Sequence, residues 1–399
     1  MNALFFFLLS IVLTADGLMT FLIPVAVYKI TGSVEYSGLS YFMWWLPRLA
    51  LIPLLGGLID KLGIRPLSIL SDCIKITGCS FLVVYKFDHP AIAAIAFGVV
   101  GSIISIGNSQ TMIGYEKIVS LLSENKAHHA NVISRLDFLG MVIGPIVGMA
   151  LLDFGYSIPL AIASLFYLLN AIFFVFVRIN ESLSSASKAQ GADLVLDRIK
   201  RSAGFVIATP IIVGLIFLSV GNNMFDGLIE SSGAAIIEKN MHLPIKYFGL
   251  VDIAAGLCGV LGTYVYGNLF KRVDRSLLMM IGIALIVIPS LVLTVFSSLM
   301  WVFISCYALS IVGKVFSGNI SRLLRIELIP IENFAGTSSF IVLLGQSVLP
   351  IVGVALYFFG EKPHIITILL GISVLASLTA GMFVFRSISA TQFHKASLE

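Results

Sequence analysis

Twelve long apolar runs, each separated from the next by a short polar segment, constrain the fold of this chain more than any other feature. An apolar run of about 20 residues is long enough to cross a bilayer as a helix. The runs are continuous and do not alternate apolar with polar residues as barrel strands do, so they predict helices. The predicted spans cover residues 3–29, 36–58, 66–87, 91–114, 131–154, 157–178, 204–236, 246–270, 276–296, 299–321, 335–359 and 364–386.

The composition argues against most soluble functions. Of the 399 residues, 58% are hydrophobic and 12% are charged, whereas a soluble domain has about 45–50% and about 25%. The net charge of +4 comes from basic residues that stand singly between apolar runs, which argues against a nucleic-acid surface. The four cysteines lie inside apolar runs without metal-ligand or disulfide spacing. No nucleotide-binding loop appears. We expect an all-α membrane protein that is not an enzyme and needs no cofactor and no metal.

The distribution of basic residues predicts the orientation of the spans. With the N-terminus in the cytoplasm, sixteen Lys and Arg residues lie in cytoplasmic loops or the tail and five lie in outer loops. Cytoplasmic loops of membrane proteins carry such an excess. Both termini are therefore expected in the cytoplasm, in a bacterial inner membrane. The first run lacks a basic n-region and a small-residue cleavage site, so we expect a retained span and not a signal peptide.

The longest polar interruption divides the chain. Residues 179–203 predict a cytoplasmic linker between two six-helix bundles, residues 1–178 and 204–399. The second part of the linker, residues 193–201, mixes apolar and charged residues and predicts a short helix on the membrane surface.

The two halves of the chain resemble each other. Residues 140–155 match residues 345–360 at nine of sixteen positions, and Asp16-Gly17-Leu18 recurs as Asp226-Gly227-Leu228. Six spans in each half make the repeats parallel, which places a binding site near the bilayer midplane between the halves.

Two motifs resemble those of a known family. The loop after the second span reads Gly56-Gly-Leu-Ile-Asp60-Lys61-Leu-Gly63-Ile-Arg65, and the fifth span carries Gly140-x3-Gly144-Pro145-x2-Gly148. The first resembles the cytoplasmic loop signature of the major facilitator superfamily, and the second resembles its antiporter signature. Residues 23–33 and 46–49 are similar to the branch that contains macrolide-efflux proteins and the enterobactin exporter. Ile64 and Met149 depart from the two signatures.

The resemblance implies that these motifs take part in the conformational switch. The implied set is Gly56, Asp60, Lys61, Gly63, Arg65, Gly140, Gly144, Pro145 and Gly148. Asp60 would link the two halves in the outward-facing state; the alternative is a simple turn. The three glycines of the fifth span stand at i, i+4 and i+8, so they let a partner helix approach closely, and ordinary helix packing is the alternative to a role in switching.

Ionisable and polar residues inside the spans are the candidates for proton coupling and substrate binding, because they are costly in a membrane unless they face a cavity or a partner. The candidates are Asp16, Arg48, Asn222, Asp226, Glu230 and Lys314. Asp16 and Asp226 are either proton sites facing a central cavity or carboxylates that brace neighbouring helices. Arg48 either pairs with Asp16 or attracts an anionic substrate. Asp72, Lys75 and Asp252 are further charges within spans.

The sequence therefore predicts a proton-coupled secondary transporter with twelve helices in two six-helix repeats. It would export a small organic molecule, either a siderophore or a hydrophobic drug, by alternating access. A carrier of metal ions or lipids on the same fold, and a membrane sensor that does not transport, are the alternatives. The expected partners are the substrate, protons and membrane lipid, with no nucleic acid, and we expect a monomer.

Overall fold

The computed structural model describes residues 3–85, 87, 89–122, 126–177, 195–330 and 334–396. Throughout these ranges the chain forms helices and no strand. Eleven described segments are long and apolar enough to cross a membrane. A further 29-residue helix, α2 (Val34–Leu62), occupies the position of the second predicted span. The prediction of an all-helical, multi-pass membrane protein is confirmed.

Long apolar faces of these helices are open to the surroundings. On α10 (Arg275–Val295), Ile288, Leu291 and Val295 are 60%, 55% and 70% exposed. A contiguous apolar surface of this kind is unfavourable in water, and lipid tails provide its natural contact.

The described helices form two compact units. The first unit comprises Met1–Ala189, Glu230–Leu257 and Gly353–Glu361, and the second comprises Gln190–Ile229, Cys258–Val352 and Lys362–Glu399. The chain therefore passes from one unit to the other within three helices. The predicted bundle boundaries, at residues 178 and 204, stay predictions.

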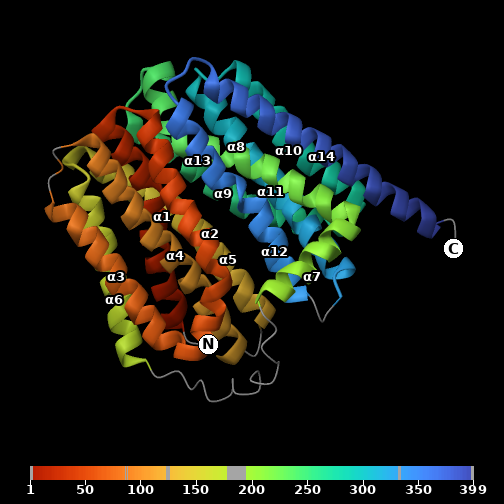
Figure 1. Ribbon diagram of the computed structural model, residues 1–399, viewed down its shortest axis with the longest axis horizontal. Coiled ribbons are helices and arrows are strands. Elements are labelled where there is room, and N and C mark those ends of the chain that lie inside the picture. The colour runs from red at the N-terminus through yellow and green to blue at the C-terminus, as the bar shows by residue number, and fades with distance from the viewer. Residues whose placement is uncertain are drawn as a thin grey trace. The chain divides into compact units, whose positions relative to one another are not determined.

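The first unit is built on paired helices. Within it, α1 packs chiefly on α5, α2 on α4, and α3 on α6; Figure 1 shows these helices as long rods coloured from red to yellow. Their bounds are α1 Ala3–Thr31, α3 Ile64–Val84, α4 Pro90–Leu122, α5 Lys126–Leu151, η1 Leu152–Phe154 and α6 Ser157–Phe176.

Glycine makes the α1–α5 contact possible. A Cβ atom on Gly140 would meet the carbonyl oxygen of Leu13, and one on Gly144 would meet the backbone of Gly17 and Leu18. The two backbones are thus as close as small residues permit in membrane helix pairs. This is the close approach that the glycine spacing predicts.

The second unit contains the remaining helices or the parts of them that lie in its ranges. Within it, α10 packs on α11 and α14, and α7 packs on α12; α14 lies beside α10 in Figure 1. The bounds are α7 Val195–Ala208, α8 Pro210–Met241, α9 Phe248–Leu269, α11 Met300–Leu328, α12 Phe334–Gln346, α13 Val348–Phe359 and α14 Ile365–Ala396. The short helix η3, Ile245–Tyr247, lies in the first unit.

The boundaries of three predicted elements differ in the structure. The short helix expected over residues 193–201 is described from Val195 and continues to Ala208. The seventh span, expected from residue 204, begins at Pro210, because proline is favoured at the first position of a helix, where its missing N–H costs nothing. The eleventh span is divided at Ser347, whose hydroxyl donates to the carbonyl of Leu344 at 2.7 Å.

Candidate functional site

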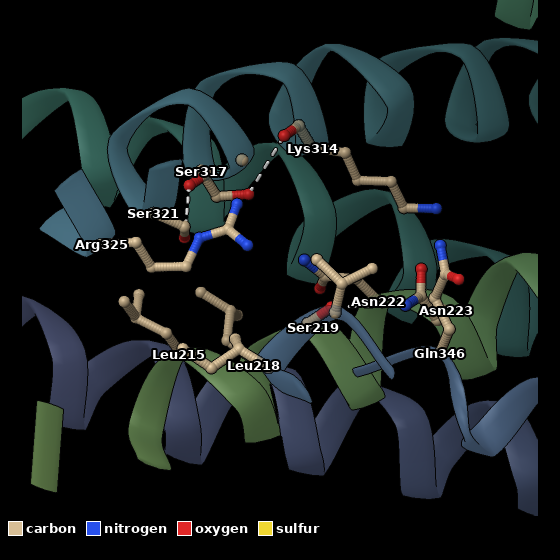
Figure 2. Close-up of a pocket in the computed structure, with 13 residues that line it drawn as sticks. Leu215, Leu218, Ser219, Asn222, Asn223, Lys314, Ser317, Ser321, Arg325 and Gln346 are labelled. Carbon is tan, nitrogen blue, oxygen red and sulfur yellow. Dashed lines mark hydrogen bonds between the residues drawn. The ribbon is translucent and has the colours of Figure 1, made fainter. Parts of the chain in front are cut away.

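A polar cavity lies within the second unit, between α8, α11 and α12 (Figure 2). Its volume is about 270 Å³. Leu215 and Leu218 form an apolar part of its wall. Its main polar side chains are Ser219, Asn222, Asn223, Lys314, Arg325 and Gln346. Such a cluster inside an apolar helical unit has a functional site as its default interpretation.

Asp226 and Lys314 form an ion pair beside this cavity. The pair joins α8 to α11, and each of the two side chains is 17% exposed. The Lys314 ammonium also lies 6.0 Å from the centre of the Phe225 ring. Pairing offsets the large cost of taking both charges out of water. The Nζ atom of Lys314 and the Oδ1 atom of Asp226 are themselves buried, so the residual exposure belongs to other atoms of the two side chains. Both residues are among the predicted candidates, and the structure brings them together.

Two amide side chains of α8, Asn222 and Asn223, line this cavity, and they differ in how many of their groups are already hydrogen-bonded. Asn223 donates to the Gly345 carbonyl at 2.8 Å and to Ser219 at 3.3 Å. Asn222 accepts a hydrogen bond from Ser377 at 3.1 Å on its carbonyl oxygen, and its NH₂ group makes no hydrogen bond with the described residues, so it has donors for a ligand. The helix therefore supplies one fixed amide and one with free donor capacity.

Arg325 lines the cavity and was missed as a site residue. The predicted tenth span ends at residue 321, so Arg325 counts there as a loop cation, but α11 continues to Leu328. The signal in the sequence is a stripe of Lys314, Ser317, Ser321 and Arg325 at i, i+3, i+7 and i+11. Residues at these spacings share one helix face.

A second set of charges is buried inside the first unit. Asp16 accepts from the Lys75 ammonium at 3.2 Å and from the Tyr167 hydroxyl at 2.8 Å, both on Oδ1. The side chains of Lys75 and Asp16 are 0% and 2% exposed. Nearby, Asn170 donates to Asp72 at 2.6 Å. Asp16 thus joins α1 to α3 and α6, as expected for the bracing alternative.

Two further observations concern the partners of Asp16 in this network. The second carboxylate oxygen of Asp16, Oδ2, is buried without a hydrogen-bond partner among the described residues, so a proton role stays a prediction. The suggested pair of Arg48 with Asp16 does not form in the described part of the chain. Arg48 instead lies over the Trp45 ring, 4.8 Å from its centre.

A smaller cavity of about 100 Å³ lies elsewhere in the first unit. Trp44, Trp45, Arg48 and Glu230 line it, and Tyr41 donates to Glu230 at 2.7 Å. The three candidate residues of α8 are therefore divided between the units, with Asn222 and Asp226 in the second unit and Glu230 in the first.

The loop signature is described only in part. The backbone of residues 56–61 is helical and belongs to the last part of α2, which ends at Leu62. The side chains of Asp60 and Lys61 and the surroundings of Gly56 lie outside what the structure describes. Gly63 has a φ of +87°, which favours glycine, and its N–H donates to the Ile59 carbonyl at 3.0 Å.

Arg65 has a defined partner in the same unit. Its Nε donates to the Phe174 carbonyl at 2.8 Å, and a terminal nitrogen donates to the Val175 carbonyl at 2.5 Å. These carbonyls end α6, where a basic side chain satisfies unpaired acceptors and complements the helix dipole. Arg65 therefore fastens α3 to the end of α6, whatever its part in a conformational switch.

Comparison with known proteins identifies the fold and the family. The model of the Major Facilitator Superfamily matches residues 3–354. None of the curated proteins compared with the chain matches its sequence. Among the described residues, no group of three or more His, Cys, Asp and Glu side chains is placed to hold a metal ion.

Several solved transporter structures share the fold. A point mutant of the nucleoside transporter NupG has a TM-score of 0.74 at 12% identity, covering 96% of this chain and 99% of its own. A bacterial homologue of the iron transporter ferroportin, in its inward-facing state, has a TM-score of 0.69 at 21% identity, covering 98% and 100%. A bacterial homologue of the human lysosomal transporter Spinster has a TM-score of 0.64 at 13% identity, covering 96% of each chain.

Proposed function

The chain belongs to the Major Facilitator Superfamily, whose members are membrane transporters, and from that premise we propose that it couples the export of a small organic molecule to protons. The observation that carries the proposal is the polar cavity beside the Asp226–Lys314 ion pair. A carboxylate in an apolar medium stays charged only while a cation compensates it. Protonation of Asp226 would therefore release Lys314, and loss of that proton would restore the ion pair.

This exchange of partners supplies a coupling step in alternating access. The substrate and the proton act on groups of the same cavity, so the occupancy of one changes the binding of the other. Asp16 is the rival coupling group, but two hydrogen-bonding partners already hold its Oδ1. We therefore assign the coupling role to Asp226 and a bracing role to Asp16.

The proposal extends to the switch and the orientation. Asp60 and Lys61 would steady one conformation from the cytoplasmic side, and the close α1–α5 contact through Gly144 would keep that pair of helices together as one body. Both termini would lie in the cytoplasm of a bacterial inner membrane, as the sixteen-to-five distribution of basic residues predicts.

Proteoliposome flux tests the function. Purified protein would be reconstituted and a panel containing a carboxylate siderophore, a catechol siderophore and a macrolide assayed with and without a pH gradient. We expect uptake of at least one organic compound to rise with the gradient that drives proton counterflow. Gradient-dependent flux of ferrous or manganous ions alone would favour a metal carrier, and binding without any flux would favour a sensor.

The metal alternative also needs a test. A ferroportin homologue in its outward-facing state also has the fold, with a TM-score of 0.65 at 20% identity, covering 98% of this chain and 100% of its own. Similarity at this level establishes the fold alone. The metal arm of the flux assay therefore belongs in the panel.

A further inference from the structure

The charges that line the cavity of the second unit do not balance. Lys314 is compensated by Asp226 on the facing helix. The Arg325 guanidinium donates a long hydrogen bond of 3.4 Å to the Ser338 hydroxyl. Its Nε is buried without a partner among the described residues. Within the part of the chain that the structure describes, Arg325 is therefore the cation of this cavity that has no acidic partner.

The cavity has two chemically different ends. Lys314 and Arg325 are eleven residues apart on one face of α11, which corresponds to roughly 16 Å along the helix axis. Figure 2 shows the Arg325 guanidinium beside Ser317 and Ser321, whereas Asn222, Asn223 and Gln346 gather on the other side. A ligand that fills the cavity meets the Arg325 cation at one end, and at the other end it meets the amides beside the charge-balanced Asp226–Lys314 pair.

The hydroxyl groups between the two ends sharpen this difference. Ser321 donates to the Ser317 carbonyl at 2.7 Å, and Ser317 donates to the Lys314 carbonyl at 3.4 Å. Their protons are thus engaged by the backbone of α11. The donors that remain for an anionic group at this end are the N–H groups of Arg325. A guanidinium presents these donors in a fork that fits the two oxygens of a carboxylate or phosphate.

The amide end offers both donors and acceptors. Asn222 keeps a free NH₂ group, and Gln346 makes no side-chain hydrogen bond with the described residues. Amides of this kind suit hydroxyl, carbonyl or amide groups of a ligand and do not require a charge. Leu215 and Leu218 add an apolar wall between the two ends.

We propose that this cavity binds an organic anion, with a carboxylate or phosphate group held by Arg325 and an uncharged hydrogen-bonding portion held by Asn222 and Gln346. The inference rests on the proposed transport function and narrows its substrate to oxyanion-bearing compounds, at the expense of hydrophobic drugs. In the proposed orientation Arg325 stands toward the cytoplasmic end of α11, where an exported anion would enter.

Equilibrium binding to the purified, detergent-solubilised protein tests the proposal without any gradient. Citrate is the carboxylate probe, inorganic phosphate is the second oxyanion and glycerol is the uncharged control, each measured by calorimetry. We expect citrate or phosphate to bind the wild type and glycerol not to bind. The Arg325→Gln variant should weaken oxyanion binding about tenfold, the usual size for losing a charge-assisted hydrogen bond.

Two further variants distinguish a direct contact between Arg325 and the ligand from a general effect of positive charge near the cavity. Arg322→Gln removes the same charge one turn away, from an exposed side chain that does not line the cavity, and should change oxyanion binding less than twofold. Arg325→Lys should fold as the wild type does and retain part of the binding. A preference for citrate or phosphate identifies the oxyanion group.

Three results would overturn the inference: no oxyanion binding to the folded wild type, equal binding by the wild type and Arg325→Gln, or equal losses in Arg322→Gln and Arg325→Gln. The proposed transport function fails separately. If the protein transports a macrolide but binds no oxyanion, the export function stands and the anion site is wrong. If the protein binds citrate through Arg325 but shows no flux of any compound, the anion site stands and the export function is wrong.

Discussion

The same tripeptide, Asp-Gly-Leu, occurs in α1 and in α8, yet its two carboxylates have different surroundings. Asp16 in the first unit pairs with Lys75, and these side chains are 2% and 0% exposed. Asp226 in the second unit pairs with Lys314 beside a cavity, and both are 17% exposed. A pair enclosed on all sides stabilises one arrangement of helices, whereas a pair beside a cavity, into which Lys314 reaches, is able to exchange its partner for a proton or a ligand.

A third pair extends the comparison beyond the apolar spans. Lys239 and Glu361, in the first unit, lie 3.2 Å apart, and their side chains are 47% and 44% exposed. The three pairs thus differ chiefly in their access to solvent. Their contributions to stability should fall in the order Asp16, Asp226, Glu361, because an unpaired charge costs more the less water can reach it.

The largest effect is expected from Asp16→Asn. This change leaves the Lys75 charge buried without its counter-ion, which costs about 3–5 kcal/mol for a buried pair. Thermal unfolding of the detergent-solubilised variant measures the loss. The double variant Asp16→Asn with Lys75→Met should recover much of it, because both charges are then removed. A normally stable Asp16→Asn protein that has lost proton-coupled flux would reverse the roles assigned to Asp16 and Asp226.

Gly144→Ala tests how rigidly α1 is held in the first unit. The new Cβ would collide with the backbone of Gly17 and Leu18, next to Asp16. Overpacking of this kind costs about 1–3 kcal/mol, which unfolding in detergent would detect. Gly371→Ala is the matched control, because nothing lies within 4 Å of a Cβ at that helical position. Equal stability of the two variants would show that the α1–α5 contact tolerates a wider spacing.

The smallest effect is expected from Glu361→Gln, and it should depend on pH. Partial burial raises the pKa of Glu361, but hydrogen bonds from the Lys239 side chain and the Val34 N–H outweigh it and hold that pKa below the usual range. A lowered pKa means that the stabilisation is present above the ordinary glutamate pKa and is lost as the pH falls through the folded-state value.

The melting temperature of the Glu361→Gln variant should therefore lie slightly below that of the wild type at pH 7, by the equivalent of about 0–1 kcal/mol. The difference should shrink as the pH falls below the ordinary glutamate range and through the lowered folded-state pKa of Glu361, because the wild-type carboxylate then becomes protonated. A difference that persists unchanged in acid would show that the carboxylate charge is not what stabilises this contact.

Much of the fold was predictable because a membrane imposes few choices. Apolar runs of sufficient length must form helices to satisfy their backbone in lipid, and the glycines of α5 indicate a close helix contact by their spacing. The breaks at Thr209 and Ser347 were not predicted, since hydropathy continues across both positions. Proline at 210 is the local signal for the first of these breaks.

The candidate site was predictable in its residue types and less so in its pairings. The sequence identifies Asp16 and Lys75 as charges within spans, but whether they meet depends on the depth of α1 against α3, which one sequence does not encode locally. The Asp226–Lys314 pair was not predictable for the same reason, because it depends on the depth of α8 against α11. Arg325 was missed for another reason: the hydropathy falls over residues 322–328 while the helix continues.

Proton movement through the Asp226→Asn variant tests the central claim most directly. The control is Asp153→Asn, which removes an exposed carboxylate that pairs with Lys246 in the first unit. Wild type, Asp226→Asn and Asp153→Asn would be reconstituted with a pH dye inside the liposomes, using the panel compound with the highest flux. We predict that Asp226→Asn still folds and still binds the compound, but that substrate-driven proton movement per molecule falls at least tenfold while Asp153→Asn matches the wild type. Undiminished proton movement in Asp226→Asn would contradict the account.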